Sequence, residues 1–535
     1  MRVGLGLAQP TGAWTNGFTY DAGHRLATVI SPAGTFTYTY KGPGNLVTNL
    51  ALPNSSRITN AFDTVGRLTS TRLLTSTSSL LNSHGYAYNL ASQRTQQTRT
   101  DASTVTYTYD NLGQLKSALG SGGQSTENLG YLYDTAWNLN KRTNNGTPTT
   151  FAVDGKNQLT SVGGLSCSYD NNGNLTTRVP VSMCYVYYTY DDENQLTSVA
   201  TDTSGTPTGS RWRSDFSYDG RGRLRKRADY TWYTGGGGMW YPAGEVRYVY
   251  DGMRVIQERN SGNTPTVAYT RGSDLSASLE GAGGIGGLLA RSVYSGGAWG
   301  AHNSYHADGN GNVTALVDSG QAVSAGYRYN PYGQVIGMSG GSMTNQNVYR
   351  FSSKEAMPNS GLYYYGYRFY DPNLQRWLNR DPLDEIGFTL MRDGNVRPAE
   401  SNSFLFVRNT PVNSLDPFGL FFAPPGTNTE GLEELGRCYA IAKGRLKEAR
   451  RLQAQGRLRP NADKWYHCVV SCEISRACNP FYAKFMGDFH ERWNRGGRED
   501  TARDQEANRI GRECGSDPCE KRSCEKCCGD HGYAR

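Results

Sequence analysis

The chain has 535 residues and a formal net charge of +8, which is modest for this length, and only 19% of its residues are charged. The sequence holds no basic stripe of the kind that binds nucleic acid, and no apolar run long enough to span a membrane. The first residues lack the apolar core of a secretory signal, so we expect the chain to begin inside a longer gene product. Its 36 tyrosines and 65 glycines are typical of strands and turns, which predicts a mainly β fold.

A short unit recurs along the first part of the chain. Its pattern is aromatic-x-Tyr-Asp-x-x-Gly-x-Leu, and clear copies begin at Tyr107 and Phe216. Tyr-x-Tyr places both rings on one face of a strand, Asp starts a turn, and Gly supplies a positive φ. The Leu then begins the next strand on the apolar face. A unit of this size cannot bury its own face, so neighbouring units must stack.

Glycine-rich stretches interrupt this pattern at residues 235–238 and 281–287. Both are predicted to be long hairpins or loops on the surface. The repeat resumes at Tyr305 and continues to about Gly340.

These repeats resemble the YD repeats of bacterial Rhs proteins, of the C components of Tc toxins and of teneurins. The resemblance implies that residues 1–340 wind into a cocoon-like β-sheet shell. Residues 341–420 are similar to the Rhs repeat-associated core domain, in the motifs Gly366-Tyr-Arg368, Arg380-Asp381-Pro382 and Asp416-Pro417-Phe-Gly419-Leu420. In that family the core plugs one end of the shell, and we expect the same arrangement here.

The resemblance also implies a reaction. The family's core cuts the chain after the Asp-Pro-x-Gly-Leu motif by aspartyl-protease-like chemistry, which would here break the bond between Leu420 and Phe421. Arg380 and Asp381 match the family's Arg-Asp pair. The partner carboxylate is either Asp384 or Asp416. Two close carboxylates can share one proton, so that one activates water and the other protonates the carbonyl.

A second interpretation of the same residues needs no chemistry. Asp-Pro pairs initiate turns, and Arg380 and Asp381 could form a salt bridge that only holds the core together.

The composition changes after Leu420. Residues 421–535 hold nine of the eleven cysteines, and residues 430–459 have helical periodicity, which predicts a small, largely helical domain. Cysteine-dense small domains are usually disulfide-bonded and extracytoplasmic, and we favour that interpretation. The alternative is zinc bound by Cys514, Cys519, Cys524 and Cys527, although a second Cys-x2-Cys pair is absent.

In Rhs proteins the segment after the core is a variable payload, often a toxin. The residues of this segment that could form a hydrolytic site are His467, Ser471, Glu473, His490, Asp504 and Asn508. His467 and Ser471 lie four residues apart, so a helix would present both on one face. A packed histidine in a disulfide-bonded domain fits the same pattern.

The favoured function is therefore an Rhs-type polymorphic toxin or effector, secreted or at the bacterial cell surface. A cognate immunity protein and a secretion apparatus are its expected partners, and no cofactor is expected. The first alternative is a surface or adhesion protein whose disulfide-rich tail is structural. The second, a free-standing enzyme, has the least support.

Overall fold

The computed structural model describes residues 1–9, 13–123, 127–179, 184–382, 402–420, 422–425 and 427. It also describes seven single residues of the tail, which are Cys468, Cys472, Ala507, Arg509, Ile510, Arg512 and Cys524. The chain divides into two compact units, Met1–Thr429 and Glu430–Arg535.

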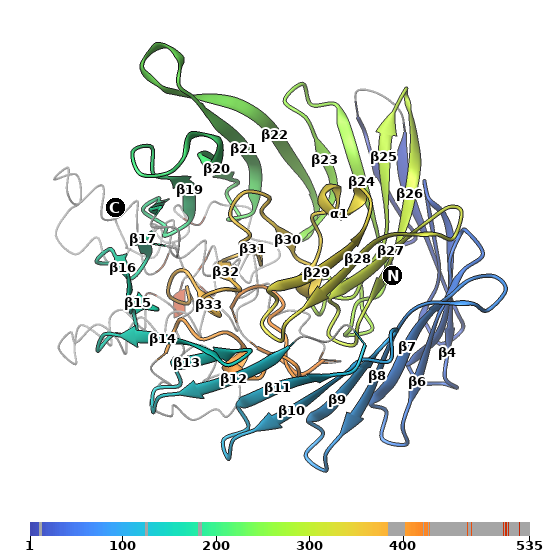
Figure 1. Ribbon diagram of the computed structural model, residues 1–535. Coiled ribbons are helices and arrows are strands. Elements are labelled where there is room, and N and C mark those ends of the chain that lie inside the picture. Colours follow the sequence, from blue (N-terminus) through green and yellow to red (C-terminus); the bar gives the residue numbers. More distant parts are fainter. Residues whose placement is uncertain are drawn as a thin grey trace. The chain divides into compact units, whose positions relative to one another are not determined.

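Unit 1 contains one antiparallel sheet of 29 strands, in which each strand pairs with the next along the chain (Figure 1). The mainly β fold predicted from the sequence is confirmed. The strands are β1 Gly4–Leu7, β2 Trp14–Tyr20, β3 Leu26–Ser31, β4 Gly34–Tyr40, β5 Val47–Ala51, β6 Arg57–Phe62, β7 Leu68–Leu74, β8 Leu80–Tyr88, β9 Arg94–Arg99, β10 Thr104–Tyr109, β11 Leu115–Ser121, β12 Asn128–Tyr133, β13 Leu139–Asn144, β14 Thr147–Val153, β15 Leu159–Val162, β16 Leu165–Tyr169, β17 Leu175–Arg178, β18 Val186–Tyr190, β19 Leu196–Thr201, β20 Trp212–Tyr218, β21 Leu224–Tyr233, β22 Met239–Asp251, β23 Arg254–Arg259, β24 Pro265–Arg271, β25 Leu288–Ser295, β26 Ala298–Ala307, β27 Val313–Asp318, β28 Val323–Tyr329 and β29 Val335–Gly340.

The repeated Asp builds the turn between strands in the way the sequence predicts. Between β10 and β11, Asp110 Oδ1 accepts hydrogen bonds from the backbone N–H groups of Leu112 and Gln114, both at 2.9 Å. Gly113 has a φ of +84°, which an L side chain rarely adopts. The same carboxylate contacts recur at Asp21, Asp63, Asp134, Asp154, Asp170, Asp191, Asp219 and Asp308.

The repeated Tyr has a role that the sequence pattern did not reveal. In several repeats its hydroxyl reaches back to the preceding hairpin and donates to the carbonyl of the residue that begins the second strand there, whereas the buried Tyr190 hydroxyl makes no such bond among the described residues. Tyr hydroxyls bind these Leu carbonyls in the pairs Tyr88 with Leu68, Tyr133 with Leu115, Tyr218 with Leu196 and Tyr250 with Leu224, at 2.6–2.8 Å. The Tyr therefore links successive repeats as well as filling the interior.

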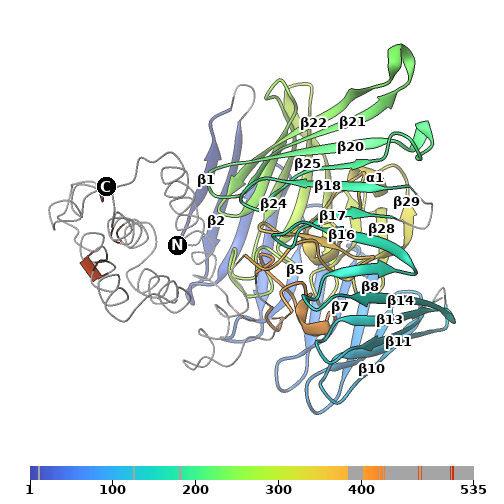
Figure 2. The same cartoon turned by 90° about the vertical axis from the view of Figure 1, so that its left-hand side faces the viewer.

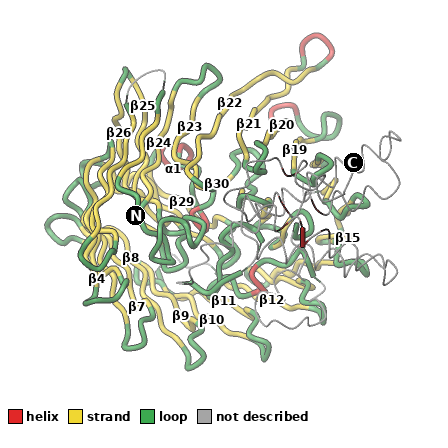
Figure 3. The backbone as a smooth tube through the Cα atoms, turned by 180° about the vertical axis from the view of Figure 1, so that it is seen from behind, coloured by secondary structure: helices red, strands yellow, loops and turns green. Residues whose placement is uncertain are grey.

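The first and last thirds of this sheet contact each other through side chains. Thr71 Oγ1 lies 3.0 Å from His306 Nε2, Asn82 donates to Thr314 at 2.8 Å, and His84 Nε2 lies 2.9 Å from Thr314 Oγ1. An apolar cluster joins the same regions, with Phe18, Phe36 and Leu73 on one side and Leu289 and Val317 on the other. β8 and β26 accordingly lie side by side, as can be followed in Figure 3.

The core segment lies within the curve of the sheet (Figure 1). It contains the short helix α1 Met343–Gln346, the 3-10 turns Phe351–Ser353 and Val407–Asn409, and a small sheet of β30 Glu355–Ala356, β31 Tyr363–Tyr364, β32 Phe369–Asp371 and β33 Arg376–Trp377. Its aromatic side chains pack against shell strands: the ring centres of Phe369 and Phe216 are 5.2 Å apart, and those of Phe404 and Tyr169 are 5.7 Å apart. The segment therefore completes the hydrophobic core of the shell.

The two glycine-rich stretches behave differently. Gly235–Gly237 lies at the turn of the long β21–β22 hairpin, as predicted. The prediction of a surface loop at residues 281–287 is wrong, because Gly281, Ala282 and Ile285 are buried. Glycine here lets the backbone approach the core segment closely. Composition alone cannot separate this role from that of an exposed loop, because both are rich in glycine.

In unit 2, all seven described residues are helical. Cys472 and Cys524 form a disulfide bond across 52 residues of sequence, and Cys468 is disulfide-bonded as well. The helix predicted at residues 430–459 lies outside the described residues. Among those described, no helix is long and apolar enough to cross a membrane.

Candidate active site

Arg368 lies between two carboxylates of the core segment. Its Nη2 is 2.7 Å from Asp381 Oδ2 and 3.9 Å from Asp416 Oδ2. The two carboxylates therefore lie close to the same guanidinium nitrogen. The guanidinium also donates to the carbonyls of Ser403 and Gly419, and it lies 4.2 Å from the centre of the Trp377 ring. Burial lowers the pKa of Arg368, and both carboxylates oppose this shift. A fixed cation therefore joins the two acids.

Asp416 organises the turn that ends at Leu420. Its Oδ1 accepts hydrogen bonds from the backbone N–H groups of Phe418, Gly419 and Leu420, at 3.2, 2.7 and 3.1 Å. Gly419 has a φ of +78°, so the turn needs glycine at this position. After the turn the chain reverses, and Ala423 pairs with Leu415 in an antiparallel bridge. The backbone before the expected cleavage point is thus held by one buried carboxylate.

Lys354 holds the same turn from another side. Its Nζ donates to the carbonyl of Pro417 at 2.6 Å and to that of Gly283 at 3.0 Å, and lies over the rings of Tyr365 and Phe418. Burial lowers the pKa of Lys354 to about 7. A neutral amine still has two N–H groups, so Lys354 can donate to both carbonyls even without its charge.

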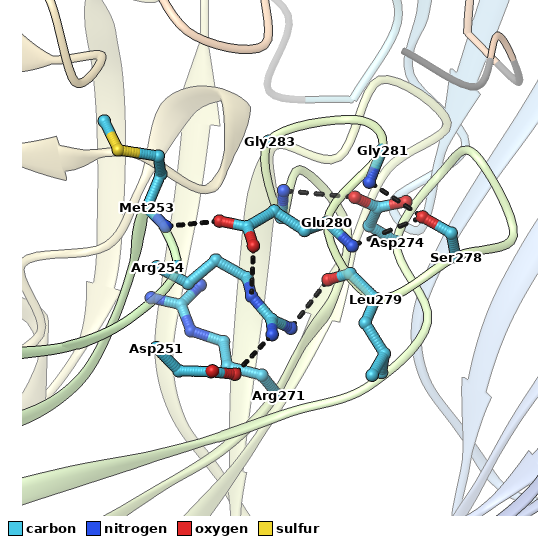
Figure 4. A network of polar contacts seen from close by, with 12 residues as sticks. Asp251, Met253, Arg254, Arg271, Asp274, Ser278, Leu279, Glu280, Gly281 and Gly283 are labelled. Carbon is cyan, nitrogen blue, oxygen red and sulfur yellow. Dashed lines mark hydrogen bonds and ion pairs between the residues drawn. The ribbon is translucent and has the colours of Figure 1, made fainter. Parts of the chain in front are cut away.

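The loop that carries Gly283 is anchored to the shell by charged groups (Figure 4). Arg254 contacts Asp251 Oδ2 at 2.6 Å and donates to the carbonyl of Leu279 at 2.6 Å, and its Nε lies 3.8 Å from Glu280. Glu280 in turn accepts a hydrogen bond from the backbone of Met253.

Within that loop, Asp274 Oδ2 accepts hydrogen bonds from the backbone of Ala282 and Gly284, at 2.7 and 3.1 Å. Burial raises the pKa of Asp274 and of Glu280. The shell therefore presents a rigid backbone edge to the Asp416 turn.

The sequence-predicted residues are brought together only in part. Asp381 and Asp416 both contact one guanidinium, but that guanidinium belongs to Arg368. Arg380 is exposed, and its side chain lies beside Gly173, where the shell has no side chain of its own. The sequence did not identify Arg368 as a site residue. A usable signal was its place in a run of aromatic residues, because an Arg that is buried there needs acidic partners.

Several candidates lie outside the described residues. These are Asp384, Phe421, His467, Ser471, Glu473, His490, Asp504, Asn508, Cys514, Cys519 and Cys527. Cys524, a zinc candidate, is bonded to Cys472 in this structure and so offers no thiolate. The part of the chain that the structure describes contains no group of three or more His, Cys, Asp or Glu side chains placed to hold a metal.

Comparisons with known proteins agree with this architecture. The family model described as Teneurin YD-shell matches residues 84–235. The chain is 26% identical to the tRNA nuclease WapA of Bacillus subtilis (strain 168), over 62% of this chain and 12% of that protein. It is also 26% identical to the double-stranded DNA deaminase toxin A of Burkholderia cenocepacia (strain H111), over 63% of this chain and 22% of that protein. The chain thus spans less than a quarter of these curated relatives.

Solved structures show the same fold. The crystal structure of TcdB2-TccC3 matches with a TM-score of 0.54 and 20% identity, over 76% of this chain and 22% of that one. The Tc holotoxin pore of Photorhabdus luminescens matches with a TM-score of 0.55 and 20% identity, over 78% and 21%. The fold and its repeated Tyr-Asp turns define a YD-repeat β shell. More particularly, the chain is similar to Rhs/YD-repeat shell proteins in sequence and in fold.

Proposed function

We propose that this chain is an Rhs-type polymorphic toxin or effector, whose β shell encloses residues 421–535 as a payload. The core segment releases that payload by hydrolysing the bond between Leu420 and Phe421. The observation that supports this most is the contact of Arg368 with Asp381 and Asp416, next to the turn that ends at Leu420.

In the proposed reaction, the oxygen of a water molecule attacks the carbonyl carbon of Leu420 while Asp381 takes a proton from that water. The bond to the Phe421 nitrogen breaks, and a proton is delivered to that nitrogen from a second carboxyl group. The reaction consumes one water and needs no cofactor. Arg368 pairs with the Asp381 side chain, and its bond to the Gly419 carbonyl holds the chain beside it. Because the substrate is part of the same chain, no association entropy is lost.

We assign the second carboxyl group to Asp384 and a positioning role to Asp416. Three backbone N–H groups already bind Asp416 Oδ1, which suits a carboxylate that fixes a turn better than one that exchanges protons during catalysis.

The test is intact-mass analysis of the purified full chain under denaturing conditions. The wild-type chain should give two fragments that meet at Leu420 and Phe421, and Asp381→Asn and Asp384→Asn should each give one uncut mass. Asp416→Asn should still be cut, because the amide oxygen can accept the same N–H bonds, whereas Asp416→Ala should be cut far less. A single uncut mass in the wild-type chain would remove the protease role from this site. An uncut Asp416→Asn would instead return Asp416 to the catalytic pair.

The toxin assignment rests on the similarity to a tRNA nuclease and a DNA deaminase toxin, and it carries neither substrate over to this chain. On this proposal the protein is secreted or displayed at the cell surface, through a secretion apparatus, and its producer makes an immunity protein. Expression of the full chain should stop growth of a bacterial host, and the gene next to it should restore growth.

The alternative is a surface protein without catalysis. The Cys472–Cys524 disulfide favours it, because a bond that closes a long loop stabilises a structural domain. An uncut wild-type chain together with unaffected host growth would support this alternative.

A further inference from the structure

The β21–β22 hairpin extends past both of its neighbours in the sheet. β20 pairs with β21 only as far as Thr231, opposite Trp212, and β23 pairs with β22 only from Arg247 to Asp251. Beyond these points the hairpin is a two-stranded ribbon in which Trp232 pairs with Trp240. The three views in Figures 1, 2 and 3 agree that it projects from the shell. A free ribbon of this kind is rarely stable without strong cross-strand contacts.

Aromatic pairs provide those contacts. The rings of Trp232 and Trp240 meet edge to face with centres 5.0 Å apart, and those of Tyr233 and Tyr241 meet in the same way at 5.5 Å. Such pairs stabilise a ribbon beyond the area they bury. The ring of Trp232 also covers the backbone at Gly238, where a Cβ would collide with it.

The ribbon's own side chains carry no charge, and its large side chains are mainly aromatic. Tyr233, Met239 and Tyr241 are 56%, 49% and 53% exposed. Residues 230–244 contain no charged side chain and no Asn or Gln. The repeat turns of the same shell are organised by an Asp side chain, which the turn of this hairpin lacks.

We propose that this hairpin tip, residues 230–244, docks on the surface of a lipid bilayer. Trp and Tyr rings favour the level of the lipid headgroups, and the tip has no charged side chain whose water would have to be removed. The glycine turn limits how deeply the tip can enter the bilayer, because the unpaired backbone groups of the turn must stay in contact with water or headgroups. The tip therefore rests in the interface and does not span the membrane.

A bilayer fits this tip better than a protein partner does. A stable protein interface uses about 20–30 residues on each side, and it includes polar groups that fix the orientation. The tip offers fewer residues, and its polar side-chain groups are only the hydroxyl and indole N–H groups of Tyr, Thr and Trp. This inference does not depend on cleavage, so it stands or falls separately from the proposed function.

The test is flotation of the purified full chain with vesicles of phosphatidylcholine alone. These vesicles carry no net charge, so the +8 charge of the chain cannot draw it to them. The wild-type chain should float, and Tyr233→Ser/Tyr241→Ser should lower its partition into vesicles at least about tenfold, through the lost apolar area. The matched control is Tyr185→Ser/Tyr187→Ser, which removes a stacked pair of rings that are each 44% exposed, and it should float like the wild-type chain.

A second variant leaves the ring pairs in place. Met239→Glu puts a charge at the tip and should also abolish flotation, while the unfolding temperature stays that of the wild-type chain. Flotation that survives both tip variants would overturn the proposal, and so would an equal loss in the control. Failure of the wild-type chain to float would overturn it too, and would leave a protein partner as the occupant of the tip.

Discussion

At the residue scale, a single tyrosine hydroxyl group links several of the repeats to the one before. Tyr218 donates to the carbonyl of Leu196 at 2.6 Å, so Tyr218→Phe leaves that carbonyl without this donor while keeping the packed ring. We expect the free energy of unfolding to fall by about 1–2 kcal/mol, measured as a lower urea midpoint at unchanged slope. Tyr187→Phe, at an exposed ring, should change it by less than about 0.5 kcal/mol. Equal effects of the two variants would show that the hydroxyl link contributes nothing.

Lys354 should make stability depend on pH in a particular window. Burial lowers its pKa to about 7 from the usual 10.5, so between these values the unfolded chain binds more protons than the folded one. The free energy of unfolding therefore gains a contribution that rises as the pH rises from about 7 to 10.5. The difference between the wild-type chain and Lys354→Met, followed by urea unfolding at several pH values, isolates this contribution. A difference that is flat across the window would mean that the lysine stays charged in the fold.

At the scale of elements, local patterns were predictable and long-range partners were not. The turn at Asp110 follows from its own Asp and Gly, because both act on backbone groups within four residues. The hydroxyl bond from Tyr218 to Leu196 spans two strands, and nothing in one repeat specifies it. The same limit explains the site: Asp381 and Asp416 could be named from motifs, but Arg368 reaches them only through the folding of the core segment.

The loop at residues 272–287, which carries Gly283, yields a prediction with a close control. Gly283 has a φ of +60°, and a Cβ there would collide with the carbonyl oxygen of Pro417. Gly296 has the same φ, but no atom of the described residues lies within 4 Å of its Cβ position. Gly296→Ala should cost about 1 kcal/mol through the backbone alone, and Gly283→Ala should cost clearly more because the Asp416 turn must move. Thermal unfolding measures both, and intact mass shows whether Gly283→Ala also slows cleavage. Similar costs would show that the turn moves freely.

At the scale of the whole shell, polar contacts hold the first third of the sheet against the last. His84 and His306 stack with ring centres 6.0 Å apart, one from β8 and the other from β26. Gln97 places its amide nitrogen 3.1 Å from His84 Nδ1, and Asn82 places its own 3.0 Å from His306 Nδ1. An imidazolium has no lone pair to accept from either amide, so both rings fit this site in the neutral form.

This buried pair should make the shell sensitive to acid. Burial lowers the pKa of His84 to about 3 and that of His306 well below its usual 6.5. The unfolded chain therefore binds more protons than the folded one as the pH falls from 6.5 towards 3, and the free energy of unfolding falls with it. Each histidine contributes up to about 1.4 kcal/mol per pH unit, so His84→Gln/His306→Gln should flatten the decline by about twice that slope.

His24→Asn, at an exposed site, should leave the slope of the wild-type chain unchanged. An equally steep decline in the double variant would assign the acid sensitivity to the carboxylates of the turns, and the contact between the first and last thirds would then be insensitive to acid.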